Sequence, residues 1–246
     1  MIEVPIIFEN DEMLVIDKPS GLRVHEDGFS TSPTLVDWFL ARVPSAKGVG
    51  EPGKGANGEL LERSGVVHRL DAETSGVLVL AKTEDAFLHL KQQFHDRLAR
   101  KEYRAFVYGT MREKWGTINR PIGRSAKDFR KRSAERGAKG TLREAVTDWE
   151  CLQNGTCEGR PYAELRLRPK TGRTHQIRVH LKAIDHPIVG DRVYGGTRAE
   201  SANGLGFSRL ALHAHTLTLT LLGGEMRTFT APLPAEFLEA AERVAS

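Results

Sequence analysis

The chain has 246 residues and a formal net charge of +4, with 39% hydrophobic and 28% charged residues. This balance is that of a globular protein with a substantial core, in one large domain or two small ones. Its two cysteines, Cys151 and Cys157, form neither a CxxC pair nor a disulfide framework. No apolar run approaches the roughly 20 residues that cross a bilayer, and we see no secretory leader, so a cytoplasmic protein is expected.

Apolar spacing and turn residues predict the elements of the first hundred residues. Short strands are expected at residues 6–8 and 13–16, the second ending where Pro19 and Gly21 favour a turn. Ser32 is the expected N-cap of a helix that continues to about residue 43, and a mobile loop is expected at 45–57. Residues 77–81 read as a buried strand. Thr83 can then cap a helix that continues to Leu98.

The rest of the chain predicts more strands than helices. A strand of period two is expected at residues 101–108, and a hairpin at 145–152 and 162–167 with its turn in the Asn154-Gly155 region. Helices are expected from about His175 to Ile184 and at 235–244, with a long alternating strand at 210–222 between them. Strands and helices that do not strictly alternate indicate the α+β class.

Asp71 lies between an arginine and a Thr-Ser-Gly turn, directly before the expected strand at residues 77–81. Gly76 can adopt backbone angles closed to other residues, and Thr74 and Ser75 can hydrogen-bond the local backbone. A tight loop braced by core elements is a common position for a catalytic group. An isolated Asp in such a loop is more often only the cap of a turn, so the decision depends on the other motifs of the chain.

Five segments in order resemble the RluA-type pseudouridine synthases and cover about residues 6–233. They are His68-Arg69-Leu70-Asp71-Ala72-Glu73-Thr74-Ser75-Gly76, Lys101-Glu102-Tyr103-Arg104-Ala105, the Arg-bearing run 168–180, Gly190-Asp191-Arg192-Val193-Tyr194-Gly195 and Arg209-Leu210-Ala211-Leu212-His213-Ala214. The resemblance implies the pseudouridine synthase fold, a mostly antiparallel mixed sheet with flanking helices and a central cleft, in a single catalytic domain over residues 1–246. Many relatives carry a basic RNA-binding module before this domain. Here the pattern begins by residue 6, so no such module is expected.

The resemblance also implies a reaction, in which uridine within structured RNA becomes its C-glycoside isomer, pseudouridine, without a cofactor. Asp71 would be the nucleophile or the proton-transfer group at the ribose. Arg178 would pair with Asp71 and keep it ionised, and Tyr103 would lie against the uracil ring. The target base must be flipped out of its stem or loop to reach Asp71. Without the motif, Arg178 could equally be a surface arginine and Tyr103 a core aromatic.

RNA contacts are expected from the catalytic domain itself. By the resemblance, Arg69 helps to occupy the space that the flipped base leaves, and Lys170, Arg173 and Lys182 are candidate phosphate contacts. The segment from Arg124 to Arg143 holds eight basic and two acidic residues, a local net charge of +6. Such a run is most often a solvated loop, but it also attracts a phosphate backbone. We expect it to be a flexible arm that contacts RNA through the cations Arg130, Lys131 and Arg132.

Two other functions are weighed against this one. A non-catalytic RNA-binding domain would share the basic segment but would have no need for the three catalytic residues together. A metal-dependent hydrolase would need the pairs His175/His180 and His213/His215 to converge, and their spacing matches no recognised zinc motif. We therefore expect no metal. Ribosomal RNA and transfer RNA are both possible substrates, with large-subunit ribosomal RNA slightly favoured, and a monomer is expected.

Overall fold

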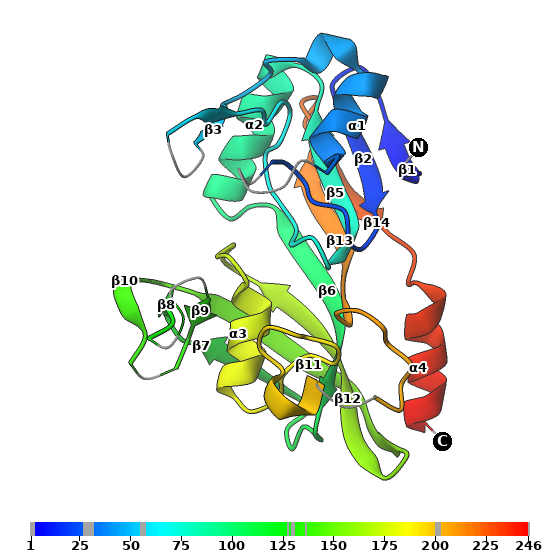
Figure 1. The fold of residues 1–246 in the computed structure, drawn as a ribbon. Helices are drawn as coiled ribbons and strands as arrows, with labels where there is room; N and C mark the ends of the chain where they lie inside the picture. The colour runs from blue at the N-terminus through cyan, green and yellow to red at the C-terminus, as the bar shows by residue number, and fades with distance from the viewer. Residues whose placement is uncertain are drawn as a thin grey trace. The chain divides into compact units, whose positions relative to one another are not determined.

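The computed structural model describes residues 3–26, 32–54, 58–126, 128, 131–135, 137–199 and 203–245. The chain divides into two compact units, Met1–Arg100 with Ala214–Ala231 and Lys101–His213 with Pro232–Ser246. The colours of Figure 1 show that each unit is built from separate stretches of sequence. None of the described helices is both long and apolar enough to cross a membrane.

The first unit is a sheet with two helices (Figure 1), in which β1–β2, β2–β5 and β13–β14 are antiparallel pairs. Its strands are, in spatial order, β1 (Ile6–Glu9), β2 (Met13–Lys18), β5 (Ser75–Ala81), β13 (Leu212–Thr220) and β14 (Met226–Thr230). The predictions of strands at 6–8, 13–16 and 77–81 are confirmed. Helix α2 (Glu84–His95) packs against β5, every residue of which is buried. The smaller elements are η1 (Pro44–Ala46) and the short pair β3 (Gly53–Lys54) and β4 (Leu60–Leu61), so part of the expected loop at 45–57 is ordered.

Helix α1 (Leu35–Arg42) begins two residues later than Ser32 predicts, because its N-cap is Thr34. The Thr34 hydroxyl accepts from the Asp37 N–H at 3.3 Å, and the Asp37 carboxylate accepts from the Thr34 N–H at 2.7 Å. This reciprocal capping box satisfies two N–H groups that the helix cannot pair itself. Helix α2 starts after Thr83, as predicted, but it ends at His95 instead of Leu98.

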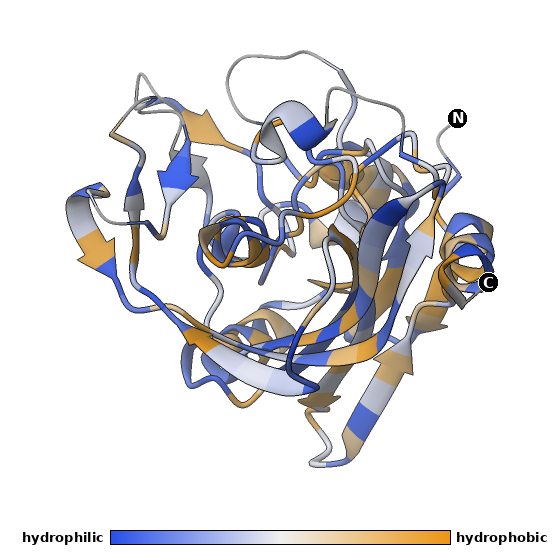
Figure 2. Ribbon diagram, turned by 90° about the horizontal axis from the view of Figure 1, so that it is seen from below, coloured by the Kyte–Doolittle hydropathy of each residue, from blue (hydrophilic) through white to orange (hydrophobic). Residues whose placement is uncertain are grey.

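The second unit contains a four-stranded antiparallel sheet, two helices and a short 3₁₀ segment. Its strands are, in spatial order, β6 (Arg100–Tyr108), β12 (Arg160–Pro169), β11 (Val146–Cys157) and β7 (Trp115–Asn119). Helix α3 (Gln176–Ala183) contacts β12, helix α4 (Ala235–Ala245) packs on β11 and β12, and η2 spans Gly196–Ala199. Figure 2 shows hydrophobic and hydrophilic residues around α4, beside the C label, as expected of a helix with one buried face.

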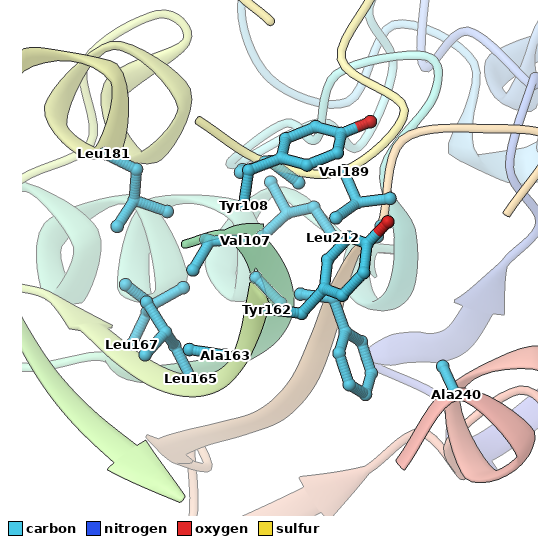
Figure 3. Close-up of a cluster of buried hydrophobic side chains, with 14 of the residues drawn as sticks. Val107, Tyr108, Tyr162, Ala163, Leu165, Leu167, Leu181, Val189, Leu212 and Ala240 are labelled. Carbon is cyan, nitrogen blue, oxygen red and sulfur yellow. The ribbon is translucent and has the colours of Figure 1, made fainter. Parts of the chain in front are cut away.

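The core of this unit is formed where β6, β12, α3 and α4 meet (Figure 3). Among its fully buried members are Val107, Tyr162, Leu165, Leu167 and Leu181. The side chain of Tyr103 is partly buried and packs against this cluster. The sheet and helices therefore fix the position of the strand that carries Tyr103.

The predicted hairpin is confirmed, but its predicted turn is wrong. Strands β11 and β12 are joined at Glu158 and Gly159, which both have positive φ angles of 52° and 71°, as in a two-residue type I′ turn. Asn154 and Gly155 lie inside β11. A Cβ atom at Gly155 would lie 1.9 Å from the carbonyl oxygen of Val244 in α4, so the glycine permits close helix packing and does not form the turn.

The described part of the basic segment is folded, and the expectation of a flexible arm is wrong for that part. Strands β8 (Ile122–Arg124), β9 (Arg132–Ser133) and β10 (Lys139–Arg143) form a three-stranded sheet in the order β10-β8-β9. Arg124 is paired with Arg132 on one side and with Lys139 on the other. Directly paired residues share a face of a sheet, so these three cations form a row, which we call the basic row. Arg130 lies outside the residues that the structure describes.

Candidate functional site

Asp71 lies on a tight turn that leads into β5. Its backbone carbonyl accepts from the Thr74 N–H at 3.1 Å. Gly76 has a φ of 114°, and a Cβ atom there would lie 2.2 Å from the carbonyl oxygen of Ala214 in β13. The predicted requirement for glycine is therefore confirmed, and the cause is the close approach of a neighbouring strand as well as the backbone angle.

A buried lysine holds the Asp71 loop in place. Lys18 has no exposed surface, and its ammonium donates to three carbonyl oxygens at 2.8 to 3.0 Å, those of Pro19, Leu22 and Ala72. The Ser20 hydroxyl donates to the carbonyl of Glu73 at 2.7 Å. A buried cation is tolerated only when its donors are satisfied. The role of Lys18 is not predictable from the sequence, in which Pro19 and Gly21 indicate only the end of a strand.

The two residues before Leu70 have different roles in the first unit. The ring of His68 stacks on Phe94 with 4.4 Å between centroids, and its Nε2 accepts from the Val79 N–H at 3.1 Å. The side chain of Arg69 is exposed, and its Nη1 lies 3.3 Å from Nε2 of His25. His68 is thus structural, while Arg69 presents positive charge at the surface beside the loop.

Tyr103 lies on β6 opposite Leu167 of β12. Tyr103 shares a face of the strand with Ala105 and Val107, which are buried in the core. On the even-numbered face, Glu102 and Arg104 form ion pairs, whereas Phe106 and Tyr108 further along the strand are buried in the same core. Glu102 pairs with Arg166 and Arg168 of β12, and Glu150 of β11 pairs with the same two arginines. Arg104 pairs with Glu164. The two faces therefore differ in chemistry only in the first half of β6, where Tyr103 lies on the face opposite Glu102 and Arg104.

Arg178 is a buried residue of α3 and not a surface arginine, since only 4% of it is exposed. Its Nε and Nη2 donate to the two carboxylate oxygens of Asp191 at 2.8 and 2.7 Å. Asp191 is completely buried and also accepts from the N–H groups of Val193 and Tyr194 at 2.9 and 3.0 Å. This bidentate pair fixes the guanidinium plane in a way that a single contact would not.

The Arg178 guanidinium also contacts the ring of Tyr194, whose hydroxyl has two further partners. The guanidinium carbon lies 5.1 Å from the centre of the Tyr194 ring, a cation–π distance. The Tyr194 hydroxyl is 2.7 Å from Nδ1 of His175 and accepts from the backbone N–H of Arg132 at 3.0 Å. The sequence predicts no separate role for Asp191 or Tyr194, although both lie in the segment Gly190–Gly195 that resembles the family.

The remaining predicted RNA contacts lie on the second unit with differing exposure. Lys170 is exposed and pairs with Asp148 at 3.0 Å, and Arg173 donates through Nε to the carbonyl of Glu144 at 3.1 Å. Further contacts join Lys131 Nζ to the carbonyl of Val193 at 3.4 Å and Lys182 Nζ to Glu135 at 3.4 Å. These residues share a unit with Tyr103 and Arg178, whereas Asp71 and Arg69 belong to the other unit.

The histidines considered as metal ligands have other partners in the structure. His180 is completely buried, with Nδ1 at 2.9 Å from the Thr147 hydroxyl and Nε2 at 2.9 Å from the carbonyl of Arg120, and burial lowers its pKa. His215 contacts the carbonyl of Ala231 at 2.9 Å. Within the described ranges, no group of three or more His, Cys, Asp or Glu side chains is placed to hold a metal ion.

Comparisons with known proteins agree on one family. The sequence profile of RNA pseudouridylate synthase matches residues 12–183. An uncharacterized RNA pseudouridine synthase of Synechocystis is 40% identical over 96% of this chain and 67% of its own length. The ribosomal large subunit pseudouridine synthase D of Haemophilus influenzae is 36% identical over 97% of this chain and 70% of its own length. The solved structure of human RNA pseudouridylate synthase domain containing 1 gives a TM-score of 0.75 at 28% identity, over 94% of this chain and 84% of that one.

Proposed function

Because the chain belongs to the RNA pseudouridylate synthase family, we propose that it isomerises specific uridines in structured RNA through Asp71, Tyr103 and Arg178. The predicted family, the predicted fold class and the assignment as an isomerase are established by the profile, by the relatives and by the likeness to a solved structure. The proposal concerns the roles of the three residues, the RNA that is modified and the way in which the base is reached.

In this proposal, Asp71 acts at the ribose of the target uridine, as nucleophile or as the group that removes a proton. Arg178 supplies the positive charge that keeps the Asp71 carboxylate ionised. The pair with Asp191 engages Nε and Nη2 of Arg178, and the guanidinium carries two further N–H donors on Nη1. Tyr103 contributes its ring against the uracil and its hydroxyl as a proton-transfer group.

The observation that best supports these roles is the burial of Arg178 with Asp191. A solvated arginine of an RNA-binding surface needs no buried carboxylate partner, and burying two charges costs free energy unless their geometry is excellent. Here the pair is bidentate and Asp191 accepts two further backbone N–H groups. Such a fixed and buried guanidinium favours an enzyme over a non-catalytic binding module.

The proposed substrate is large-subunit ribosomal RNA, with transfer RNA as the second possibility. The support is that its relatives include the ribosomal large subunit pseudouridine synthase D of Haemophilus influenzae. The target base is flipped out of the helix, at a cost of a few kcal/mol, while Arg69 fills the vacated space and basic residues of the second unit contact phosphates. We further propose that the two units act as one catalytic domain in a cytoplasmic monomer that needs no cofactor.

The test is to map pseudouridines in total RNA from cells with and without this gene, by chemical adducts that stop reverse transcription. We expect at least one stop to disappear with the gene and to return with the wild-type gene. It should not return with a gene that encodes Asp71→Asn. Identical maps in all the strains, followed by no product from purified protein on the same RNA, would contradict the proposal and would favour a binding module.

A further inference from the structure

Lys101 lies two residues before Tyr103 on β6, so both side chains project from the same face of the strand. A Cβ atom at Gly172 would lie 3.7 Å from the Lys101 ammonium, which places Nζ beside the loop that leads into α3. That loop ends at the helix that carries Arg178. Lys101 therefore stands between the strand of one proposed catalytic residue and the loop that leads to another.

The charges of the opposite face give a useful contrast. Glu102 and Arg104, the neighbours of Lys101 on that face, take part in the ion pairs with β12 described above. Among the described residues, no carboxylate, carbonyl or hydroxyl accepts a hydrogen bond from Lys101. The strand thus pairs the charges of one face and leaves a cation on the other.

Desolvation of an ammonium that has no protein acceptor costs free energy even where, as at Lys101, Nζ keeps some contact with solvent. Lys101 is partly buried, and desolvation lowers its pKa to about 8, so it remains mostly protonated at neutral pH. A hydrophobic side chain would pack on this face without that cost. The cost is offset if a negative charge arrives beside Lys101 during the reaction.

We propose that Lys101 is a further catalytic residue, whose ammonium stabilises the negative charge that develops on the target uracil. The inference rests on the proposed function, in which Tyr103 lies against that base. When the C1′–N1 bond breaks, its electron pair stays with uracil and spreads onto O2 and O4, while the ribose is held by Asp71. The C1′–C5 bond then forms as any bond between Asp71 and the ribose breaks. The proton of C5 leaves by way of the Tyr103 hydroxyl, and N1, which has lost its bond to the ribose, takes up one proton in exchange. Lys101 donates a hydrogen bond throughout and transfers no proton, so the isomerisation stays balanced without a co-reactant.

The experiment compares Lys101→Met and Lys101→Arg in the full chain, on unmodified transcripts of the host's large-subunit ribosomal RNA and transfer RNAs. Met keeps the length of the side chain without its charge, and Arg keeps the charge. We expect Lys101→Met to lower the single-turnover rate about 10²- to 10³-fold, the usual effect of removing one donor to a developing anion. The RNA affinity of Lys101→Met should stay within about threefold of wild type, because the negative charge that Lys101 stabilises has not yet developed in the bound substrate. Lys101→Arg should have a single-turnover rate at least tenfold higher than that of Lys101→Met.

The matched control is Lys114→Met, which removes an exposed lysine from the same unit and should change neither the rate nor the affinity. Weaker RNA binding by Lys101→Met with an unchanged rate at saturation would overturn the proposal and make Lys101 a phosphate contact. Equal losses for the Met and Arg variants would instead make it a packing residue. Wild-type protein that forms no pseudouridine would contradict the proposed function, whereas a Met variant as fast as active wild type contradicts only the role of Lys101. Circular dichroism of each variant shows that it is folded.

Discussion

Arg178 and Asp191 form a bidentate ion pair inside the second unit, with both N···O distances below 3 Å. The arginine is on a helix and the aspartate is on the turn that follows it, so the pair joins two of the motifs that resemble the family. Asp191 contacts no substrate in the proposed mechanism. It acts through Arg178 and is therefore a positioning residue.

We predict that Asp191→Asn reduces the free energy of unfolding by about 3 to 5 kcal/mol, because it leaves the buried Arg178 charge without its counter-ion. The single-turnover rate should also fall by tenfold or more, since the guanidinium loses one of its two fixed contacts. Urea denaturation and single-turnover assays measure the two effects. Asp148→Asn is the control, because Asp148 pairs with the exposed Lys170 and such surface pairs contribute at most about 1 kcal/mol. Equal losses in the free energy of unfolding would show that the buried pair stabilises the fold no more than the surface pair does.

Asp71→Asn should abolish turnover and leave RNA affinity within a few-fold of wild type. The amide keeps the shape of the side chain and removes the anion that the chemistry needs. Asp11→Asn, at an exposed position of the same unit, should be fully active. Pseudouridine formation by Asp71→Asn at a tenth of the wild-type rate would exclude Asp71 as the essential group.

Tyr103→Phe should bind RNA normally and react at least 10²-fold more slowly. The ring that packs on the core remains, but the hydroxyl is lost, and a general acid or base usually contributes 10²- to 10⁴-fold. Thermal unfolding should change little, because the ring that packs on the core is kept. Single-turnover kinetics equal to those of wild type would limit Tyr103 to a structural role.

The basic row of Arg124, Arg132 and Lys139 should contact RNA phosphates. Like charges directly opposite each other destabilise a sheet, and a phosphate backbone would offset that cost. Each contact contributes about 0.7 to 0.9 to the slope of log affinity against log salt, so changing all three to Ser should flatten the slope by about two units. The rate at saturating RNA should equal that of wild type, because the lost contacts bind the substrate and the transition state equally.

A control for the basic row removes the same charge elsewhere. Arg42, Lys91 and Arg243 each pair with a carboxylate of their own unit, and changing these three to Ser should leave the slope near that of wild type. Equal slopes for both triple variants would mean that the basic row does not touch phosphate and that only net charge matters.

Lys101 should make stability depend on pH in a particular direction. Its pKa is about 8 in the folded chain, against an ordinary lysine value of 10.5, so between these values the unfolded chain binds a proton that the folded chain does not. The contribution of Lys101 to the free energy of unfolding therefore rises with pH from about 8 to about 10.5. Below pH 8 the buried ammonium lowers the free energy of unfolding by its full amount. Urea denaturation at several pH values should show that Lys101→Met lacks this rise, whereas Lys114→Met keeps it. Parallel curves for wild type and Lys101→Met would contradict the lowered pKa.

Sequence alone predicted those features that depend on local pattern. The buried strand after Asp71, the cap at Thr83 and the hairpin all follow from apolar spacing and turn chemistry. The features that it missed depend on contacts between distant residues. Gly155 looks like a turn residue until α4 is seen to pack on it, and the charge run from Arg124 gives no sign of the strand pairing that folds it. Arg178 could be located by its motif, but its partner Asp191 could not, because nothing in a linear sequence shows which carboxylate will be buried.

The hydrogen bonds of Lys18 limit how far the Asp71 loop can be transplanted. The carbonyl of Ala72 is held by a residue 54 positions earlier in the chain, and that of Glu73 by Ser20. A peptide of residues 66–76, or the same stretch grafted onto another scaffold, would carry the motif but not the donors that shape it. An engineer who moves this loop must therefore move residues 18–22 with it, so the smallest portable unit is a pair of segments and not a single one.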